Sequence, residues 1–412
     1  MLKKLFKSNS RIYLDYASIT PIDPRVAKEV LKYSGAEYAN PSSLYTEGVT
    51  AKKALIEARK SVASFIHAQP DEIVFTGGGT EANSLAIEGV VRAAVHSGSV
   101  KPHIIVSAIE HSSIIETARM MEKQGCEVTY IPVNGAGVVS VEDIKKAVNE
   151  NTILVSVMTV NNEVGTIQPI RDIAKVIRQY RKVSSAVTPS KVYPLFHTDA
   201  AQAVICCELF VEKLGVDLMT LDAGKMYGPR GVGCLYVKRG TPIESIIQGG
   251  GQEAGMRSGT ENIPCIMGFA KAVEIILGER SRDDQKVEAT EQKGVGRIAE
   301  ADRLAKLRDM MIGGLKKIRS DISVNGEGAE TSPHILNVSI PGIDNELFLF
   351  RLDARGIACS TKSSCLRDDD ESYVLKAMKA DSRSSIRFSF GRWTNVNDIR
   401  KALKAIEEVL SK

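Results

Sequence analysis

Short apolar segments alternate with amphipathic segments along most of the chain. Near-continuous apolar runs rich in Val, Ile and Leu predict buried strands at 73–76, 103–107, 128–131, 153–158, 195–198, 218–221 and 234–237. Between them, apolar residues recur at intervals of three and four, which predicts helices at 46–65, 80–94, 112–123, 141–148 and 170–180. Strands that are apolar on both faces and separated by helices favour a mostly parallel sheet with helices on both sides.

The pattern changes after residue 278. Residues 279–300 include 11 charged residues among 22, which predicts an exposed helix extension or a mobile connector. A second α/β pattern follows, with helices predicted at 304–318 and 346–355, strands at 335–340 and 385–390, and a final amphipathic helix from about 399 to 410. We therefore predict two domains: a larger α/β domain over 25–280, and a smaller α+β domain built from 1–24 and 281–412.

Composition excludes several classes of protein. The 412 residues are 43% hydrophobic and 25% charged, as in a soluble globular protein, and unlike a disordered chain, a collagen-like fibre or a disulfide scaffold. The net charge of +4 and the aromatic content of 5% give no support for a nucleic-acid partner. Seven cysteines without CxxC spacing suggest reduced thiols in the cytoplasm, with neither zinc nor disulfides.

No membrane contact is expected from the sequence. No apolar run approaches the roughly 18–20 residues that a membrane-spanning helix needs. Residues 1–11 hold four Lys or Arg but are not followed by an apolar stretch, so they do not resemble a secretory signal. We expect a frayed basic terminus there, with an arm that touches a membrane or a partner as the alternative.

A glycine run marks the first candidate for chemistry. Gly77, Gly78 and Gly79 follow a predicted strand and open a predicted helix. Glycines allow the backbone to approach a ligand closely, and a helix N-terminus offers unpaired N–H groups, so a phosphate is the natural occupant. A tight turn without a ligand explains the same residues equally well. The P-loop and GxGxxG patterns are absent.

Three further candidates follow predicted strands. Lys225 lies on a glycine-rich turn and is either a surface lysine or a Schiff-base lysine. Asp199 ends an apolar strand, where it would either bond a cationic ring nitrogen or cap a helix. His111 follows another strand and is either structural or catalytic. Each of these residues has an ordinary structural explanation when it is taken alone.

Their order and spacing resemble a known family. From about residue 13 to the C-terminus the chain resembles the cysteine desulfurases, pyridoxal-phosphate enzymes of the class V aminotransferase group with the aspartate-aminotransferase fold. The resemblance rests on Leu14-Asp15-Tyr16-Ala17-Ser18-Ile19-Thr20-Pro21, Asn40-Pro41-Ser42-Ser43, Gly78-Gly79-Thr80-Glu81-Ala82-Asn83, Glu110-His111, Asn161-Asn162-Glu163-Val164-Gly165-Thr166, Asp199 with Gln202, Lys225, Gly249-Gly250-Gly251-Gln252-Glu253, Arg257-Ser258-Gly259-Thr260 and Ile386-Arg387-Phe388-Ser389.

The resemblance implies how the large domain binds pyridoxal 5'-phosphate. Lys225 would hold the cofactor covalently and later move the α-proton of the substrate. Asp199 would keep the pyridinium nitrogen protonated, which makes the ring an electron sink. His111 would stack on the ring, while Asn162 and Gln202 would contact its phenolic oxygen.

The resemblance also assigns the phosphate and the substrate. Gly79 and Thr80 would hold the phosphate at the helix N-terminus, joined by Thr260 from a second subunit. That last role implies a homodimer with shared active sites. Arg387 would bind the carboxylate of L-cysteine, for which its planar fork of donors is suited.

By the same resemblance, Cys365 is the nucleophile that attacks the substrate sulfur. It precedes a polar run at 367–371 that predicts a mobile, exposed loop. A free thiol titrates near ~8.5, so Cys365 needs a cationic neighbour, for which Lys362 and Arg367 are candidates. Cys359 lies on the apolar side of the same segment, and we expect it to be a core residue.

The sequence departs from the family in the turn before the lysine. Asp222 and Gly224 stand where relatives usually carry the serine and histidine that bind the phosphate. Two unit charges of like sign at 4 Å repel by about 4 kcal/mol at an effective dielectric near 20. Asp222 would therefore be turned away, be protonated or reach the phosphate through a cation or altered donors; otherwise cofactor affinity is reduced. Tyr45 and Leu366 also replace a usual histidine and a usual small polar residue.

These residues lead to one main hypothesis and two alternatives. The main one is an L-cysteine desulfurase that releases alanine, forms a persulfide on Cys365 and passes sulfur to an iron–sulfur scaffold or a tRNA-thiolation protein. The first alternative is another pyridoxal-phosphate enzyme of this fold, either a selenocysteine lyase or an aminotransferase. The second is a cofactor-poor subunit that carries sulfur or binds a partner without catalysis.

Overall fold

The larger sheet of the computed structural model has seven strands. The structure describes residues 11–187, 192–284, 295–361 and 371–411. The strand order is β2-β8-β7-β6-β5-β3-β4, and all neighbours are parallel except β8, which is antiparallel to β2 and β7. The strands are β2 (Ile73–Thr76), β3 (His103–Ser107), β4 (Glu127–Ile131), β5 (Thr152–Ser156), β6 (Leu195–Asp199), β7 (Leu218–Asp222) and β8 (Gly233–Val237). The expected mostly parallel sheet is confirmed.

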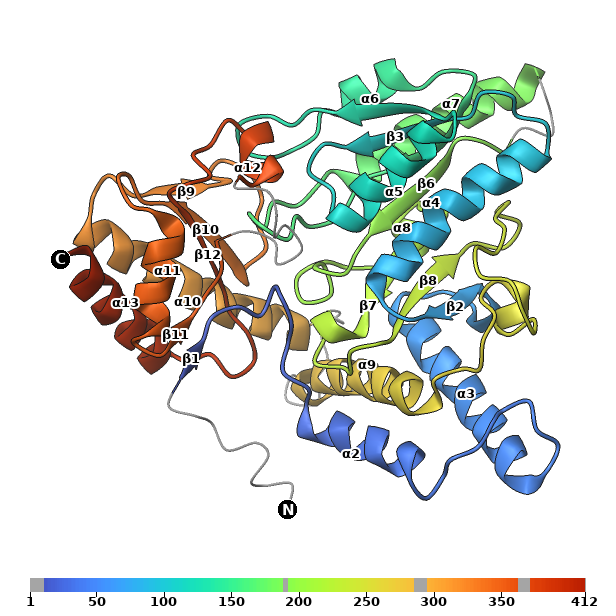
Figure 1. Ribbon diagram of the computed structural model, residues 1–412, viewed down its shortest axis with the longest axis horizontal. Coiled ribbons are helices and arrows are strands. Elements are labelled where there is room, and N and C mark those ends of the chain that lie inside the picture. Colours follow the sequence, from blue (N-terminus) through green and yellow to red (C-terminus); the bar gives the residue numbers. More distant parts are fainter. Residues whose placement is uncertain (1–10, 188–191, 285–294, 362–370, 412) are drawn as a thin grey trace.

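Helices cover both faces of this sheet (Figure 1). Side chains alternate along each strand, so that Ile104 and Val106 pack toward one face and Ile105 toward the other. The first face is covered by α4 (Gly79–His96) and α5 (Ser112–Lys123). The opposite face is covered by α3 (Thr46–Phe65), α6 (Val141–Ala147), α7 (Ile170–Val187), α8 (Val211–Leu214) and α9 (Ile263–Asp284). Burial on both faces explains why these strands are apolar throughout.

A second buried cluster is formed by residues from both ends of the chain. Its antiparallel sheet has the order β12-β10-β9, and β1 pairs in parallel with β11 beside it. Figure 1 shows β1 in blue among the orange and red C-terminal elements. The elements are β1 (Ile12–Tyr13), β9 (Ser323–Asn325), β10 (Ile335–Ser339), β11 (Ile357–Ala358), β12 (Ser385–Ser389), α10 (Val295–Ile318), α11 (Asn345–Asp353) and α13 (Val396–Leu410). Helix α12 (Tyr373–Ala377) packs instead in a separate small cluster with Ile109 and Val164.

The predicted strands lie within two residues of their observed bounds, and the helices differ mainly in length. The helix expected at 170–180 continues to 187, and the one expected at 304–318 begins at 295. The charged segment 279–300 contains the end of α9 and the start of α10, as a helix extension requires, while 285–294 lie outside the described residues. The prediction omitted α2 (Pro24–Ser34) and α9, which pack against each other through Val26, Ala272 and Ile275.

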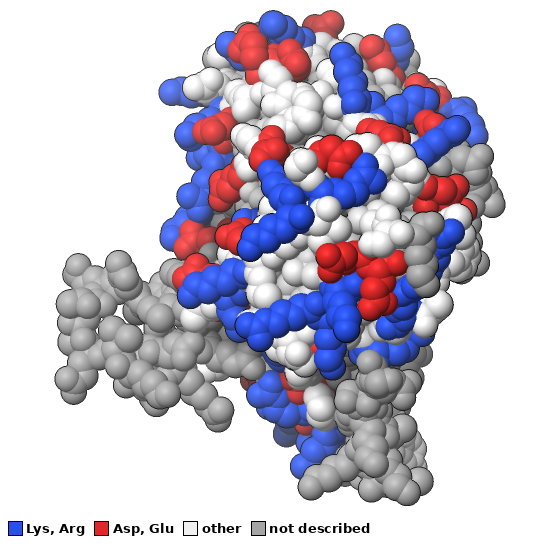
Figure 2. All heavy atoms as spheres, turned by 90° about the vertical axis from the view of Figure 1, so that its left-hand side faces the viewer, with Lys and Arg blue, Asp and Glu red and all other residues white. Residues whose placement is uncertain are grey.

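The surface of the second cluster of elements carries charges of both signs. On the side of the molecule formed by the elements of the second cluster, basic and acidic side chains are interspersed (Figure 2). This mixture creates no field of a single sign on that face. Among the described residues, no helix combines the length and the apolar character that crossing a bilayer demands.

Candidate active site

A cavity of about 190 Å³ lies where the carboxyl ends of β5, β6 and β7 meet the start of α4. In open α/β sheets this edge is where ligands bind. The cavity contains eight of the ten residues to which the sequence assigned a role, and Asp222 as well. Its lining is Ala17, Ser18, Gly79, Thr80, Asn83, His111, Met158, Val160, Asn162, Asp199, Ala201, Gln202, Asp222, Lys225 and Arg387.

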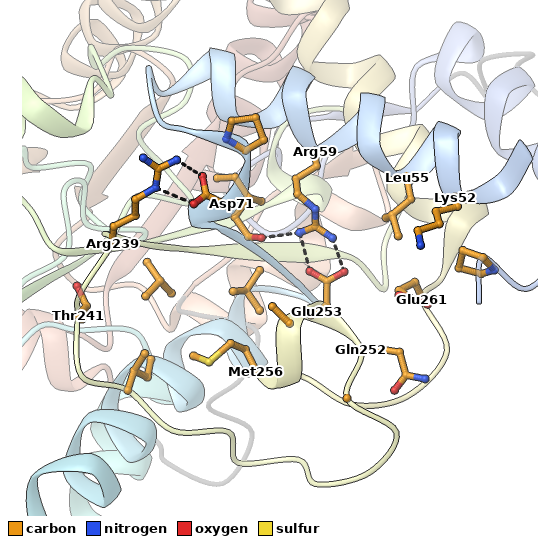
Figure 3. Close-up of a pocket in the computed structure, with 18 of the residues that line it drawn as sticks. Lys52, Leu55, Arg59, Asp71, Arg239, Thr241, Gln252, Glu253, Met256 and Glu261 are labelled. Carbon is orange, nitrogen blue, oxygen red and sulfur yellow. Dashed lines mark hydrogen bonds and ion pairs between the residues drawn. The ribbon is translucent and has the colours of Figure 1, made fainter. Parts of the chain in front are cut away.

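A larger cavity of about 740 Å³ contains none of these residues. It lies beside α3 and is bordered by ion pairs of Arg59 with Glu253 and of Arg239 with Asp71 (Figure 3). These four charged groups are thus already paired within the chain, while Lys52, Lys238 and Glu261 also border the cavity. The smaller cavity, which brings together lysine, histidine, aspartate and arginine, is the better candidate for chemistry.

Lys225 lies inside the smaller cavity and is only partly exposed. It belongs to the turn η2 (Ala223–Lys225), which follows β7. Its Nζ donates to the carbonyl oxygen of Ala17 at 3.0 Å and also to that of Ser18. The N-terminal segment therefore holds the ε-amine in the cavity, and the interpretation of Lys225 as an ordinary surface lysine is wrong.

Asp199 is fixed by hydrogen bonds at both carboxylate oxygens. Its Oδ1 accepts from the amide of Ala201 at 2.9 Å, and its Oδ2 accepts from Nδ2 of Asn83 at 2.8 Å. Asn83 also donates to Oγ of Ser113 at 2.9 Å. Asp199 is only 7% exposed. Its carboxylate is therefore largely shielded from solvent, where an electrostatic interaction with a cationic group is strong.

His111 caps helix α5 at the rim of the cavity. Its Nδ1 accepts from the amide of Ser113 at 3.2 Å and lies 2.8 Å from the Oγ of that residue. Because Nδ1 accepts, we assign the proton of the neutral ring to Nε2. The sequence alternatives for His111 are therefore not exclusive, since the residue caps a helix and lines the cavity as well.

Gln202 connects the cavity to His334, the residue that precedes β10. Its Nε2 donates to the carbonyl oxygen of Ala17 at 2.8 Å, and its Oε1 lies 3.3 Å from Nε2 of His334. His334 in turn bonds Oγ of Ser332. The sequence analysis did not predict a role for His334, because nothing local to its position indicates that it reaches Gln202.

Arg387 is buried at 1% exposure on β12. Its Nη2 donates to Oδ1 of Asp15 at 2.9 Å and to Oγ of Ser18 at 2.6 Å, and its Nη1 donates to the carbonyl oxygen of Asn162 at 2.8 Å. Its Nε is buried without a partner among the described residues. A buried guanidinium held in this way is preorganised to bind a carboxylate.

Asp222 faces the N-terminus of α4. Its Oδ2 accepts from the amide of Gly79 at 3.1 Å, and its Oδ1 accepts from the amide of Gly224 at 2.7 Å. Of the alternatives for Asp222, the structure does not show the one in which the residue is turned away, because two backbone donors draw its carboxylate toward the helix terminus.

The remaining candidates lie apart from the cavity or outside the described residues. Thr260 is exposed and borders a separate hollow, so within one chain it does not line the cavity. Cys365, and the candidate cations Lys362 and Arg367, lie outside the described residues, as does Leu366. Cys359 as a whole residue is partly buried. Burial of its thiol group raises the pKa of Cys359 to about 12.

Two buried groups near the cavity were not given a role by the sequence analysis. Asn83 bonds Asp199, and its Oδ1 is buried without a partner among the described residues. Its position one helical turn after Gly79 was the available signal. Glu110 is fully buried, and burial together with the nearby charge of Asp199 raises its pKa to about 8.

We expect Glu110→Gln to weaken the pH dependence of stability. The folded carboxyl group has a pKa of about 8, against an ordinary value of 4.5, so the folded state binds more protons between these values. The free energy of unfolding therefore falls as the pH rises through this window, by up to roughly 1.4 kcal/mol per unit from this group. Melting temperatures at pH 5 and pH 8 should differ less in Glu110→Gln than in the unsubstituted protein.

A control for this measurement lies on the same segment. Glu116 is exposed on α5, so Glu116→Gln should keep the pH dependence of the unsubstituted protein. An equal fall in melting temperature in all three proteins would show that Glu110 is ionised throughout the window.

The fold and the cavity together define a class of protein. A mostly parallel seven-stranded sheet carrying a lysine and an aspartate in one cavity at its carboxyl edge is the arrangement of pyridoxal-phosphate enzymes of fold type I. The chain belongs to the aminotransferase class-V family, whose model matches residues 12–402. Pyridoxal phosphate is the cofactor of this family.

Several relatives share one activity by name. The cysteine desulfurase IscS of Dictyoglomus turgidum is 38% identical over 97% of this chain and 95% of its own length. The mitosomal cysteine desulfurase of Encephalitozoon cuniculi is also 38% identical, over 97% of this chain and 87% of its own length. Both matches span nearly the whole chain.

Solved structures agree with this family. A NifS-like protein superposes with a TM-score of 0.85 at 33% identity, covering 97% of this chain and 99% of that protein. The structure of SspA in complex with cysteine gives a TM-score of 0.72 at 30% identity, covering 92% of this chain and 98% of SspA.

The residues of the cavity fit the cofactor at its ring. A lysine amine, a buried carboxylate and the unpartnered Oδ1 of Asn83 supply the polar groups that an aldehyde-bearing pyridinium requires. At the phosphate end of the cofactor, the N–H groups at the N-terminus of α4 suit an anion. One of these, the amide of Gly79, is already bonded to the carboxylate of Asp222.

Proposed function

We propose that the protein is an L-cysteine desulfurase that converts L-cysteine to L-alanine and leaves the sulfur on Cys365 as a persulfide. The observation that carries this proposal is that Lys225, Asp199 and Arg387 line one cavity. They come from three elements, η2, β6 and β12, that are distant in sequence. The names of the relatives support the reaction, since they match nearly the entire chain.

Each residue of the cavity has a place in holding the cofactor. Lys225 would bind its carbonyl carbon, Asp199 its ring nitrogen, His111 its ring face, and Gln202 with Asn162 its phenolic oxygen. Gly79 and Thr80 would hold the phosphate, with Thr260 reaching in from a second subunit of a homodimer. When bound, the cofactor supplies a positively charged ring that withdraws electrons from the α-carbon of the substrate.

The chain itself supplies binding and proton transfer. Arg387, held by Asp15 and Ser18, would bind the carboxylate of L-cysteine. The carbonyl oxygens of Ala17 and Ser18 hold the ε-amine of Lys225 in the cavity. In its neutral form this amine would remove the α-proton, and as the ammonium it would return it. Proton transfer by a side chain placed in this way contributes typically 10²–10⁴-fold to a rate.

The described residues that flank 362–370 are attached next to residues of the cavity. On one side, Ser360 exchanges backbone hydrogen bonds with Arg387 at 3.1 and 2.6 Å. On the other, the hydroxyl of Tyr373 donates to the carbonyl oxygen of Glu110, the residue before His111. Both attachments adjoin residues that line the cavity, which supports Cys365 as the nucleophile.

The sulfur transfer can be written without an added oxidant. The thiolate of Cys365 attacks the sulfur of L-cysteine, the carbon–sulfur bond breaks, and Cys365 gains the sulfur as a persulfide. The electron pair of the broken bond remains with the three-carbon product, which leaves as alanine after protonation. An acceptor protein of iron–sulfur assembly or tRNA thiolation would then remove the sulfur, in the cytoplasm.

We expect the purified protein, loaded with cofactor, to release alanine and sulfide in equal amounts from L-cysteine when a thiol reductant is present. Both products are measured in one time course, with selenocysteine and with pairs of amino acid and keto acid as other substrates. Transfer of an amino group to a keto acid would identify an aminotransferase, and a strict preference for selenocysteine would identify a selenocysteine lyase. Failure to bind the cofactor would indicate a non-catalytic subunit.

A further inference from the structure

The carboxylate of Asp222 accepts a hydrogen bond from the helix N-terminus at which the proposed function places the cofactor phosphate. It accepts from the amide of Gly79, the first residue of α4, at 3.1 Å. Its second oxygen accepts from the amide of Gly224 at 2.7 Å, and no cation contacts it among the described residues. The charge of Asp222 is therefore balanced by backbone dipoles alone.

The two glycines beside Asp222 show that its carboxylate is packed into this position. A Cβ atom at Gly79 would lie 3.1 Å from Oδ2 of Asp222. A Cβ atom at Gly224 would lie 3.1 Å from Oδ1 of Asp222 and 2.7 Å from Cδ1 of Ile19. A histidine at 224 would require the end of the Ile19 side chain to move and the carboxylate of Asp222 to shift slightly, so Gly224 leaves room for Asp222 in this position.

The cations that line the cavity have other partners. Nζ of Lys225 donates to two carbonyl oxygens, and Arg387 is paired with Asp15. A phosphate that enters with Asp222 in place thus meets a carboxylate that has backbone donors but no cationic partner among the described residues. Like charges at this spacing repel, and the amide of Gly79 cannot serve both anions fully.

We infer that Asp222 competes with the cofactor phosphate for the N-terminus of α4, so that the site discriminates little between pyridoxal phosphate and phosphate-free pyridoxal. This inference rests on the proposed placement of the phosphate at Gly79. The bound phosphate displaces the carboxylate from the amide of Gly79. Asp222 is in this sense a specificity-determining residue, because it lowers the contribution of the phosphate to cofactor affinity.

The test is a cycle of two ligands and two proteins. The apoprotein and its Asp222→Asn variant are titrated with pyridoxal phosphate and with pyridoxal, and binding is followed by the absorption of the bound ligand. Asparagine keeps the shape and an oxygen that accepts from a backbone amide, but it removes the charge. We expect Asp222→Asn to bind pyridoxal phosphate at least tenfold more tightly and to change pyridoxal binding less than threefold.

Differences between the two free ligands cancel, because each ligand is compared only between proteins. Asp172→Asn is the matched control, since Asp172 lies in the first turn of α7, is exposed and is remote from the cavity. It should leave both affinities unchanged. The apoprotein of Asp222→Ala gives a second reading: it should melt at a lower temperature, having lost both backbone hydrogen bonds, and still bind pyridoxal phosphate more tightly.

Two results would overturn the inference. One is an Asp222→Asn variant whose affinity for pyridoxal phosphate is unchanged or lower. The other is an equal gain for pyridoxal, which would mean that Asp222 acts on the whole cavity and not on the phosphate. Binding is measured without substrate, so an apoprotein that shows the expected cycle but does not turn over cysteine would contradict the proposed reaction alone.

Discussion

Lys225→Ala is expected to abolish covalent attachment of the cofactor and to lower cysteine turnover by about 10⁴-fold or more. The ε-amine is the only lysine nitrogen that lines the described cavity, where two carbonyl oxygens hold it. Its loss removes both the covalent link and the proton carrier, and proton transfer alone contributes up to about 10⁴-fold. The absorption band of the bound cofactor and the rate of alanine release measure the two effects.

Lys213→Ala is the control for this variant. Lys213 is exposed on α8 and pairs with Glu208, so its removal should leave the absorption band and the rate unchanged. A Lys225→Ala protein that retained the absorption band would show that another amine holds the cofactor, and the assignment of the cavity would be wrong.

Cys365→Ala is expected to lower sulfide and alanine production by about 10³-fold or more and to eliminate the protein-bound persulfide. Attack on sulfur requires a thiolate, and no other group on the chain is assigned to this step. Alanine release, and mass spectrometry of the protein after brief exposure to L-cysteine, measure the two losses. Cofactor absorption should remain, because Cys365 has no assigned role in holding the cofactor.

Cys359→Ala provides a matched control on the same segment. Burial raises the pKa of the Cys359 thiol to about 12, so this residue stays protonated at neutral pH and is a poor nucleophile. Its alanine variant should keep the persulfide on Cys365. A persulfide that persists in Cys365→Ala and disappears in Cys359→Ala would assign the nucleophile to residue 359.

Much of the fold followed from local pattern. The apolar runs predicted all seven strands of the larger sheet, since strands buried on both faces are apolar at every position. Helix bounds were less certain. Helix α9 was omitted although it is largely buried, because its apolar residues do not form the single stripe that marks a surface helix.

The order of the motifs along the chain indicates most of the residues that line the cavity. His111 and Lys225 follow strands and Asp199 ends one, and the carboxyl ends of parallel strands meet at one edge of the sheet, where Gly79 also lies after β2. A local signal combined with this topological rule was therefore sufficient to bring them together. The division of the chain near residues 25 and 280 stays a prediction.

The sequence by itself determined most of the elements, the sheet type and the candidate residues for the site, because periodicity, turn residues and motif order are all local properties of the chain. The tertiary structure alone decided which group each side chain bonds. Arg387 is paired with Asp15, which lies 372 positions earlier in the sequence. Asp222 turns toward Gly79 because two backbone amides attract its carboxylate. Such partners are chosen by packing between segments distant in sequence, and no local pattern records that choice.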